Sequence, residues 1–183
     1  MIGNNNRGNT ERRGRPGQIE GFDQVIIEIA RVTRVMKGGK RMRFRACVVL
    51  GDRKGKVGMA VAKARDVTLA VNKAATKARK NLIHIVTVND TIPHQARAKF
   101  KAAKVLLKPA PKGSGIIAGG AVRSVLDLAG VANVVAKILG SNNKINNVKA
   151  ALAALKSMKR VEPRNSKKFV NAVKMETKKA KAD

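Results

Sequence analysis

The sequence is poor in aromatic residues and in cysteine, and both shortages limit what the chain can do. Trp and Tyr are absent from its 183 residues, and four Phe account for an aromatic content of 2%. A core must therefore be aliphatic, and no aromatic platform is available for stacking unpaired bases. The single cysteine, Cys47, cannot form an internal disulfide. It lies within a predicted strand, so we expect a small core residue rather than a nucleophile, in a reducing compartment.

Acidic residues are also scarce. Eleven Asp and Glu stand against forty Lys and Arg, which gives a formal net charge of +29 and a pI near 11.5. Such a chain repels itself unless a polyanion neutralises it. A solvated surface would mix both signs of charge, so it explains the composition poorly. A nucleic acid is the expected partner, with an acidic membrane surface as the alternative, and binding should weaken as salt rises.

The sequence offers little for catalysis, for metal binding or for insertion into a membrane. The two histidines, His84 and His94, have no cluster of Cys or carboxylates beside them, so we expect no metal site. The acids are scattered, and no Ser-His-Asp or Cys-His arrangement is evident. No segment has the pattern of a signal peptide or the length of a membrane span. We expect no enzyme, no cofactor, no membrane span and a cytoplasmic location.

A glycine-rich loop over residues 113–120 is the one feature that invites an enzymatic interpretation. It lacks the Gly-Lys-Ser/Thr ending of a P-loop, and its Gly-x-Gly-x-x-x-Gly spacing is one residue too long for a dinucleotide fingerprint. Three uses remain open. The glycines could allow close packing or contact with a protein, the start of the following helix could hold an RNA phosphate, or the loop could bind a nucleotide.

The stretch from Lys37 to Asp66 contains the clearest binding signal. In residues 41–50, apolar residues at even positions alternate with residues that begin with three arginines, so a strand would have one apolar face and a second face that begins with three arginines. Lys37-Gly38-Gly39-Lys40 before it is predicted to be a tight hairpin turn, and residues 51–55 are a second basic turn. The two basic turns and the arginine-bearing strand together suggest a surface that binds a polyanion.

The remaining pattern predicts an α+β chain in four parts. Residues 1–21 are expected to be a disordered basic arm, and residues 161–183 a basic tail in which 169–175 could be helical. Residues 22–88 predict strands at 22–36, 41–50, 56–63 and 82–88, with a bulge near Ile26–Ile27 and a helix at 67–81 capped by Asp66. Residues 89–160 predict two extended segments within 92–109, a helix ended by Gly130, a strand at 131–139 and a helix at 145–158.

Two predicted surfaces in the first half could make contacts: one face of the third strand and one side of the helix. Gly58, Ala60 and Ala62 make one face of the third strand small, as if another element packs closely on it. Lys73, Lys77 and Lys80 form a stripe on the predicted helix, which is either a solvated face or an RNA contact.

The motifs together resemble one family. The KGG turn, the GD-x-x-G-x-VG block, the GIIAGGA loop and the LGSNN-x-IN block occur in the order of the bacterial small-subunit ribosomal protein S5 family, over residues 22–158. The resemblance implies a first domain like a double-stranded-RNA-binding domain and a two-layer αβ second domain with a left-handed βαβ crossover. It also implies a structural role in the small subunit, in support of translation and decoding accuracy. The implied partners are small-subunit rRNA, the S4 and S8 proteins, and mRNA nearby where it enters the subunit.

The site residues follow from the charge pattern and from the resemblance. Gly115 and Arg123 occupy positions that border the S4 protein in the family. The predicted rRNA-binding residues lie on the hairpin, the second basic turn and the end of the third strand: Arg31, Thr33, Arg34, Lys37, Gly38, Gly39, Lys40, Arg41, Arg43, Arg45, Arg53, Lys54, Lys56, Lys63 and Arg65.

Two other functions compete with the ribosomal one. A free-standing regulator that binds double-stranded RNA would use the same first domain, but it would not need the second. A small-molecule kinase could share the fold type of the second domain, but such enzymes carry a catalytic carboxylate and a substrate domain.

Overall fold

A computed structural model describes residues 21–159, in which two αβ units follow each other along the chain. This is the α+β class that the sequence predicts. The predicted arm, apart from Gly21, and the predicted tail lie outside the described residues.

The first unit is a four-stranded antiparallel sheet with one helix. Its strands pair in the order β1-β2-β3-β4, and a register shift between Ile26 and Glu28 confirms the predicted bulge. The last strand is shorter than the predicted 82–88, since its pairing with β3 covers only residues 82–84. Beyond it, the Ile85 amide donates to the Gly55 carbonyl at 2.7 Å and the Ile85 side chain is buried. The elements are β1 (Asp23–Met36), β2 (Gly39–Gly51), β3 (Lys56–Ala64), α1 (Val67–Arg79) and β4 (Leu82–His84).

The second unit is a mixed sheet with two helices. Its strands pair in the order β5-β6-β8-β7, and β7 runs parallel to β8 with α2 between them in sequence, so β7-α2-β8 is the predicted βαβ unit. Its left hand remains an expectation from the resemblance. The two residues of β7 lie in the glycine-rich segment and were not predicted as a strand. The elements are β5 (Ala96–Phe100), β6 (Ala103–Pro109), β7 (Ile116–Ile117), α2 (Gly120–Ala129), β8 (Val134–Ile138) and α3 (Lys144–Ser157).

The helix ends follow from short-range polar contacts. The Asp66 carboxylate accepts a hydrogen bond from the Val67 amide at 2.7 Å, and the Asn143 side chain accepts one from the Ile145 amide at 3.1 Å. Gly130 ends α2 in the left-handed conformation, with φ of 78°. These contacts confirm Asp66 and Gly130 as helix boundaries.

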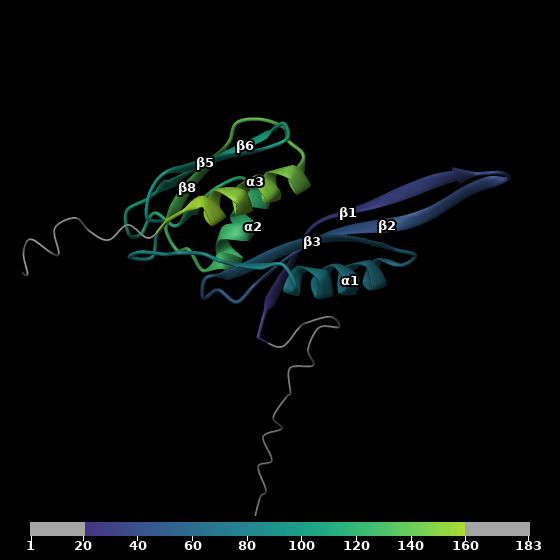
Figure 1. Ribbon diagram of the computed structural model, residues 1–183, viewed down its shortest axis with the longest axis horizontal. Helices are drawn as coiled ribbons and strands as arrows, with labels where there is room; N and C mark the ends of the chain where they lie inside the picture. The colour runs from purple at the N-terminus through teal and green to yellow at the C-terminus, as the bar shows by residue number, and fades with distance from the viewer. Residues whose placement is uncertain (1–20, 160–183) are drawn as a thin grey trace, which may run out of the picture.

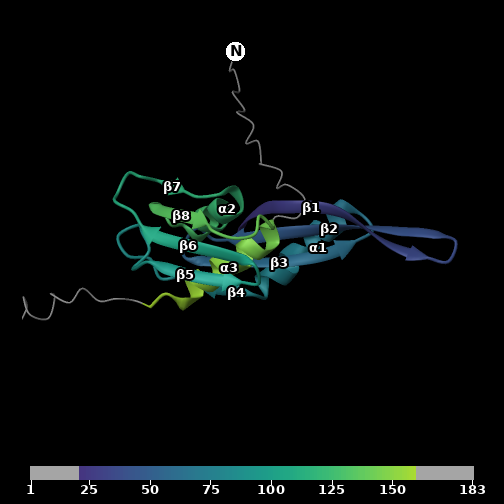
Figure 2. The same cartoon turned by 90° about the horizontal axis from the view of Figure 1, so that it is seen from above.

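The elements stack in four layers (Figure 1). Helix α1 covers the outer face of the first sheet. Helices α2 and α3 lie between the inner face of that sheet and the second sheet, and α2 packs against β1, β2, β3 and β7. Figure 2 shows the second sheet at one end and the β1–β2 hairpin extending beyond the layers at the other.

Strand β2 is buried on both faces where the layers cover it. Ala46, Val48 and Leu50 pack against α1, while Val49 joins a core that includes Leu126 and Leu155 of α2 and α3. The face predicted to begin with three arginines is exposed only in the outer half of the strand, at Arg41 and Arg43. Its other half, with Cys47 and Val49, is buried. The predicted small face of β3 is confirmed: a Cβ on Gly58 would lie 2.7 Å from the Ala78 carbonyl oxygen of α1.

Candidate nucleic-acid interface

The part of the hairpin beyond the layers forms a projecting arm. Strand β3 last pairs with β2 at Phe44–Ala64, so residues 32–43 have no third strand beside them. We call these twelve residues the hairpin arm. At the usual rise per residue, it extends about 20 Å from the body. Its sequence contains five cations and no acid.

The arm ends in a two-residue turn. Met36 pairs with Gly39 across Lys37 and Gly38, as the sequence predicts. Gly38 has φ of 81° and Gly39 has φ of 153°, and an L side chain rarely adopts either conformation. The two glycines therefore shape the turn that places Lys37 and Lys40 at its tip.

Three arginine positions of the arm meet in one hollow. The hollow has a volume of about 260 Å³ and opens on the face of the sheet that carries Arg34, Arg41 and Arg43. We call it the arginine hollow. None of its lining residues is acidic, and the full lining is Val32, Thr33, Arg34, Met36, Arg41, Arg43 and Lys63. Because like charges crowd there without a carboxylate, the hollow suits an anionic group from outside the chain.

The arm also exposes apolar side chains. Val35 is 74% exposed, and Met36 and Met42 are exposed as well. An isolated monomer gains nothing from placing such side chains in water, and clustered exposed apolar groups mark contact surfaces. The arm is therefore suited to a partner that covers it.

Two of the predicted rRNA-binding arginines are engaged within the chain. The Arg45 guanidinium lies 3.5 Å from the Glu28 carboxylate, and both side chains are half-buried. The Arg53 guanidinium lies 2.9 Å from the Asp23 carboxylate and 4.0 Å from that of Asp127. These ion pairs were invisible in the sequence, because each acid is distant from its arginine along the chain.

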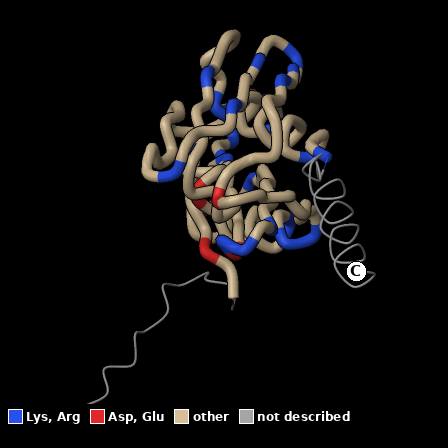
Figure 3. Tube along the Cα trace, turned by 90° about the vertical axis from the view of Figure 1, so that its left-hand side faces the viewer, with Lys and Arg blue, Asp and Glu red and all other residues tan. Residues whose placement is uncertain are grey.

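The second basic turn is not part of the arm surface. Arg53, Lys54 and Lys56 lie at the opposite end of β2 from Lys37, about 40 Å away at the usual strand rise. Arg31 is exposed at the base of the arm, and Lys63 and Arg65 are exposed at the end of β3. The structure thus brings Arg34, Arg41, Arg43 and Lys63 together and separates them from the turn. Figure 3 shows that basic positions occur all around the described trace, whereas acidic positions are few.

Cys47 is a core residue, as predicted. It is 1% exposed, and burial together with the nearby Glu28 carboxylate raises the pKa of its thiol to about 11. The thiol is therefore protonated at neutral pH, which does not suit a nucleophile.

The glycine-rich loop is held by one buried polar residue. Asn133, 7% exposed, accepts hydrogen bonds at its Oδ1 from the amides of Gly113 at 3.0 Å and Gly115 at 3.1 Å. Gly113 and Gly115 have φ of 91° and 66°, but an added Cβ would meet nothing within 4 Å at either position. These glycines thus serve the turn geometry rather than close packing. Asn133 was missed, although it is the single polar residue between apolar residues 131 and 136.

Three further features bear on function: the position of Arg123, the possible metal ligands and the hydrophobicity of the helices. Arg123 is exposed in the first half of α2, downstream of the loop that holds Gly115. Within residues 21–159 no group of three His, Cys, Asp or Glu could hold a metal ion. No helix in the same range is long and apolar enough to cross a membrane.

Fold and surface together define a basic αβ protein of two sheets with a projecting cationic arm. Residues 22–86 match the family model described as "Ribosomal protein S5, N-terminal domain", and residues 98–168 match "Ribosomal protein S5, C-terminal domain". The chain belongs to the ribosomal protein S5 family.

A curated relative supports this assignment. The "Small ribosomal subunit protein uS5c" of Spinacia oleracea is 52% identical over 141 residues, which cover 76% of this chain and 46% of the relative. The chain therefore spans about half the length of the curated relative that it matches.

Proposed function

We propose that this chain is a non-enzymatic, structural constituent of the small ribosomal subunit and that it binds the rRNA of that subunit. The observation that carries the proposal is the arginine hollow on a projecting arm that has no acids. The partner of this cationic surface is inferred from the family: the relative is named as a small-subunit protein, so the polyanion is the rRNA of that subunit. The expected location is the ribosome.

The arm is suited to folded RNA rather than to single strands. Its described surface carries guanidinium and ammonium groups but no aromatic side chain on which an unpaired base could stack. Helical RNA is recognised mainly by shape and by contacts to phosphates and 2′-hydroxyls. Phosphates held in the arginine hollow would fix the register of the arm on the RNA.

The finer role follows the family resemblance. The second unit faces neighbouring proteins, with Gly115 and Arg123 toward S4 and another part of the unit toward S8. The arm reaches rRNA near the junction of body and head, and the chain as a whole lies beside the path along which mRNA enters. Through the S4 contact the chain supports decoding accuracy. The Asn133 hydrogen bonds support this proposal, because they fix the loop that carries Gly115 before any partner binds. A photocrosslinker at position 123 would identify the neighbouring protein.

Sedimentation tests the broad proposal. A tagged full-length chain expressed in its own cells should co-sediment with the small subunit and with the assembled ribosome in a sucrose gradient. A chain that stays in the light fractions would instead be a free-standing regulator.

The hollow itself is tested by neutralising Arg41 and Arg43 in the full-length chain. Each arginine that pairs with a phosphate contributes about 0.7 to 0.9 to the slope of log affinity against log salt, so R41Q/R43Q should reduce that slope by roughly 1.4 to 1.8. Binding to transcribed small-subunit rRNA is measured across a salt series. A matched control, K99Q/K137Q, removes two exposed charges from the second sheet. An unchanged slope in R41Q/R43Q would remove the hollow from the interface.

A further inference from the structure

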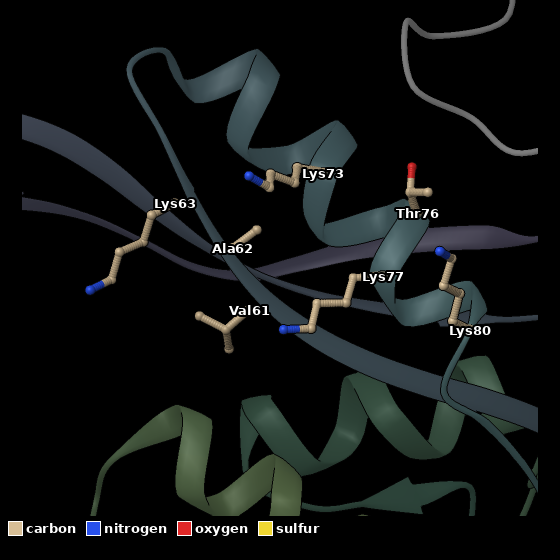
Figure 4. A pocket seen from close by; sticks show the side chains of 7 residues that line it. All are labelled: Val61, Ala62, Lys63, Lys73, Thr76, Lys77 and Lys80. Atoms are coloured by element: carbon tan, nitrogen blue, oxygen red, sulfur yellow. The ribbon is translucent and has the colours of Figure 1, made fainter.

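A second cationic groove lies along α1, on the side where β3 has no neighbouring strand. Strand β4 pairs with β3 only at residues 56–58, so Met59 to Ala64 form a free edge. The groove between this edge and α1 has a volume of about 560 Å³. Its lining consists of Val61, Ala62, Lys63, Lys73, Thr76, Lys77 and Lys80 (Figure 4). We call it the lysine groove.

The fold explains the shape of this groove. Buried alanines at positions 70, 74, 75 and 78 bring α1 close to the sheet, and the lysines occupy the neighbouring helix positions. Lys73, Lys77 and Lys80 are spaced by four and three residues, so they stand along one side of the helix over about 10 Å. In Figure 4, Lys73 and Lys77 extend from α1 toward the free edge, from which Lys63 extends outward.

The charge of the groove is not compensated within the described part of the chain. None of its lining residues is acidic, and the ion pairs found among residues 21–159 involve only Arg45 and Arg53. The nearest acid along α1 is Asp66, which caps the start of the helix. Four ammonium groups around one groove repel one another, so an anion that binds between them relieves this repulsion.

Lys63 connects the groove to the arm. It lines both the lysine groove and the arginine hollow, so the two hollows adjoin at this side chain. The combined surface begins at Arg34, Arg41 and Arg43, passes Lys63 and continues along α1 to Lys80. We call it the basic track.

We infer that the basic track is one continuous binding surface for the sugar–phosphate backbone of folded RNA, in which the lysine groove holds a second set of phosphates. This inference rests on the proposed function and assigns to the RNA interface three residues, Lys73, Lys77 and Lys80, that the charge pattern alone left open between solvent and RNA.

The lining favours RNA over an acidic protein. Protein interfaces are depleted of lysine at their centre and depend on buried aromatic, Met or Arg anchors in well-packed pockets. The groove has lysines throughout and only Val61, Ala62 and Thr76 as uncharged lining. Lysine is a compact point charge with rotatable donors, which suits phosphates at variable positions along a backbone.

The test neutralises the groove without disturbing the helix. The variant K73Q/K77Q/K80Q keeps exposed positions and a similar helix propensity, so circular dichroism and thermal unfolding should match the parent. Its slope of log affinity against log salt, measured with transcribed small-subunit rRNA and the full-length chain, should fall by about 2 to 3. The matched control K99Q/K137Q/K156Q removes three exposed lysines outside the track and should change the slope by less than about one. The charge-retaining variant K73R/K77R/K80R should bind as the parent does.

The outcomes separate this inference from the proposed function. If R41Q/R43Q weakens rRNA binding and K73Q/K77Q/K80Q does not, the arm binds RNA and the inference about the groove is wrong. If neither variant changes the salt slope and the chain does not sediment with the subunit, the proposed function fails as well. If the groove variant binds rRNA normally but loses a protein from the purified subunit, the groove is a protein-binding site and the inference is overturned.

A double-mutant cycle tests whether the arginine hollow and the lysine groove form one continuous surface. K63Q alters the side chain shared by both hollows, so its effect should depend on whether the groove is intact. In a double-mutant cycle, K63Q should cost at least about threefold less affinity in the groove variant than in the parent chain. Strict additivity would show that the two hollows bind RNA independently.

Discussion

At the residue scale, the contact between the two units depends on how the turn after β2 is held. The Asp52 carboxylate accepts hydrogen bonds from the amides of Lys54 and Lys56, each at 2.8 Å. In the turn shaped in this way, the Arg53 amide donates to the Leu128 carbonyl at 3.0 Å and the Gly55 amide to the Ala129 carbonyl at 3.1 Å. One acid thus organises the backbone that joins the first sheet to the end of α2.

Asp52 should make stability depend on pH. Burial raises the pKa of its carboxyl, but hydrogen bonds from the Lys56 and Lys54 amides outweigh burial and hold the pKa below its ordinary value. A group whose pKa is lower in the folded state stabilises the fold above its unfolded pKa, near pH 4, and loses this contribution as pH falls through the folded pKa. D52A should therefore lower the free energy of unfolding by about 1 kcal/mol at pH 7, and the difference from the parent should shrink below pH 4.

Urea unfolding at pH 7 and at several values below pH 4 measures this difference. D52N is the matched control, since it keeps an oxygen acceptor at the turn but cannot titrate. A difference between parent and D52A that is equal at pH 3 and pH 7 would contradict the assignment.

At the element scale, the packing of α1 on β3 depends on the absence of a side chain at one position. A Cβ at Gly58 would lie 2.7 Å from the Ala78 carbonyl oxygen and 2.9 Å from that of Asn81, so α1 would have to move away from the sheet. G58A should destabilise the protein by about 1–3 kcal/mol, the usual cost of overpacking. G120A is the control, because Gly120 begins α2 and an added Cβ meets nothing within 4 Å.

Thermal and urea unfolding of both variants decide the outcome. G120A should be neutral or slightly stabilising, since Ala favours helices over Gly by about 1 kcal/mol. If G58A is as stable as the parent, the close approach of α1 to β3 is not a constraint on the sequence.

Elements were predictable where local signals sufficed. Alternation predicted β2 and β3, an N-cap predicted the start of α1, and the small face of β3 predicted a close helix. The short β7 was not predictable, because two residues carry no periodicity and their pairing with β8 depends on tertiary structure. The candidate site was predictable as a set of charges but not as a surface: no local pattern shows that Arg45 pairs with Glu28, or that Lys63 joins two hollows.

At the scale of the whole molecule, the two units share one core although the sequence divides them near residue 89. Val49 and Val57 of the first sheet lie in the same buried cluster as Leu126 of α2, Leu155 of α3 and Val105 of β6. The arm is thus mounted on a single body that spans both family domains.

This shared core predicts cooperative unfolding. The chain contains no Trp, so F22W and F100W, made separately, give one fluorescent reporter in each unit. Both Phe are partly buried, Phe22 against the small cluster beneath α1 and Phe100 against the shared core. Urea transitions followed by the two reporters should coincide, with the same midpoint and the same slope, because the units lose their common core together.

A variant that separates the units provides the contrast. A Cβ at Gly130 would lie 2.0 Å from the Arg53 carbonyl oxygen, and Gly130 has φ of 78°, so G130A should force the turn of the first sheet away from the end of α2. Left-handed strain alone should cost roughly 1–3 kcal/mol. In the G130A variant, the urea midpoints reported by F22W and F100W should differ, since each unit is then stabilised less by its contact with the other. Transitions that already differ in the parent would show that the layers behave as independent domains, and the arm would then be mounted on the first unit alone.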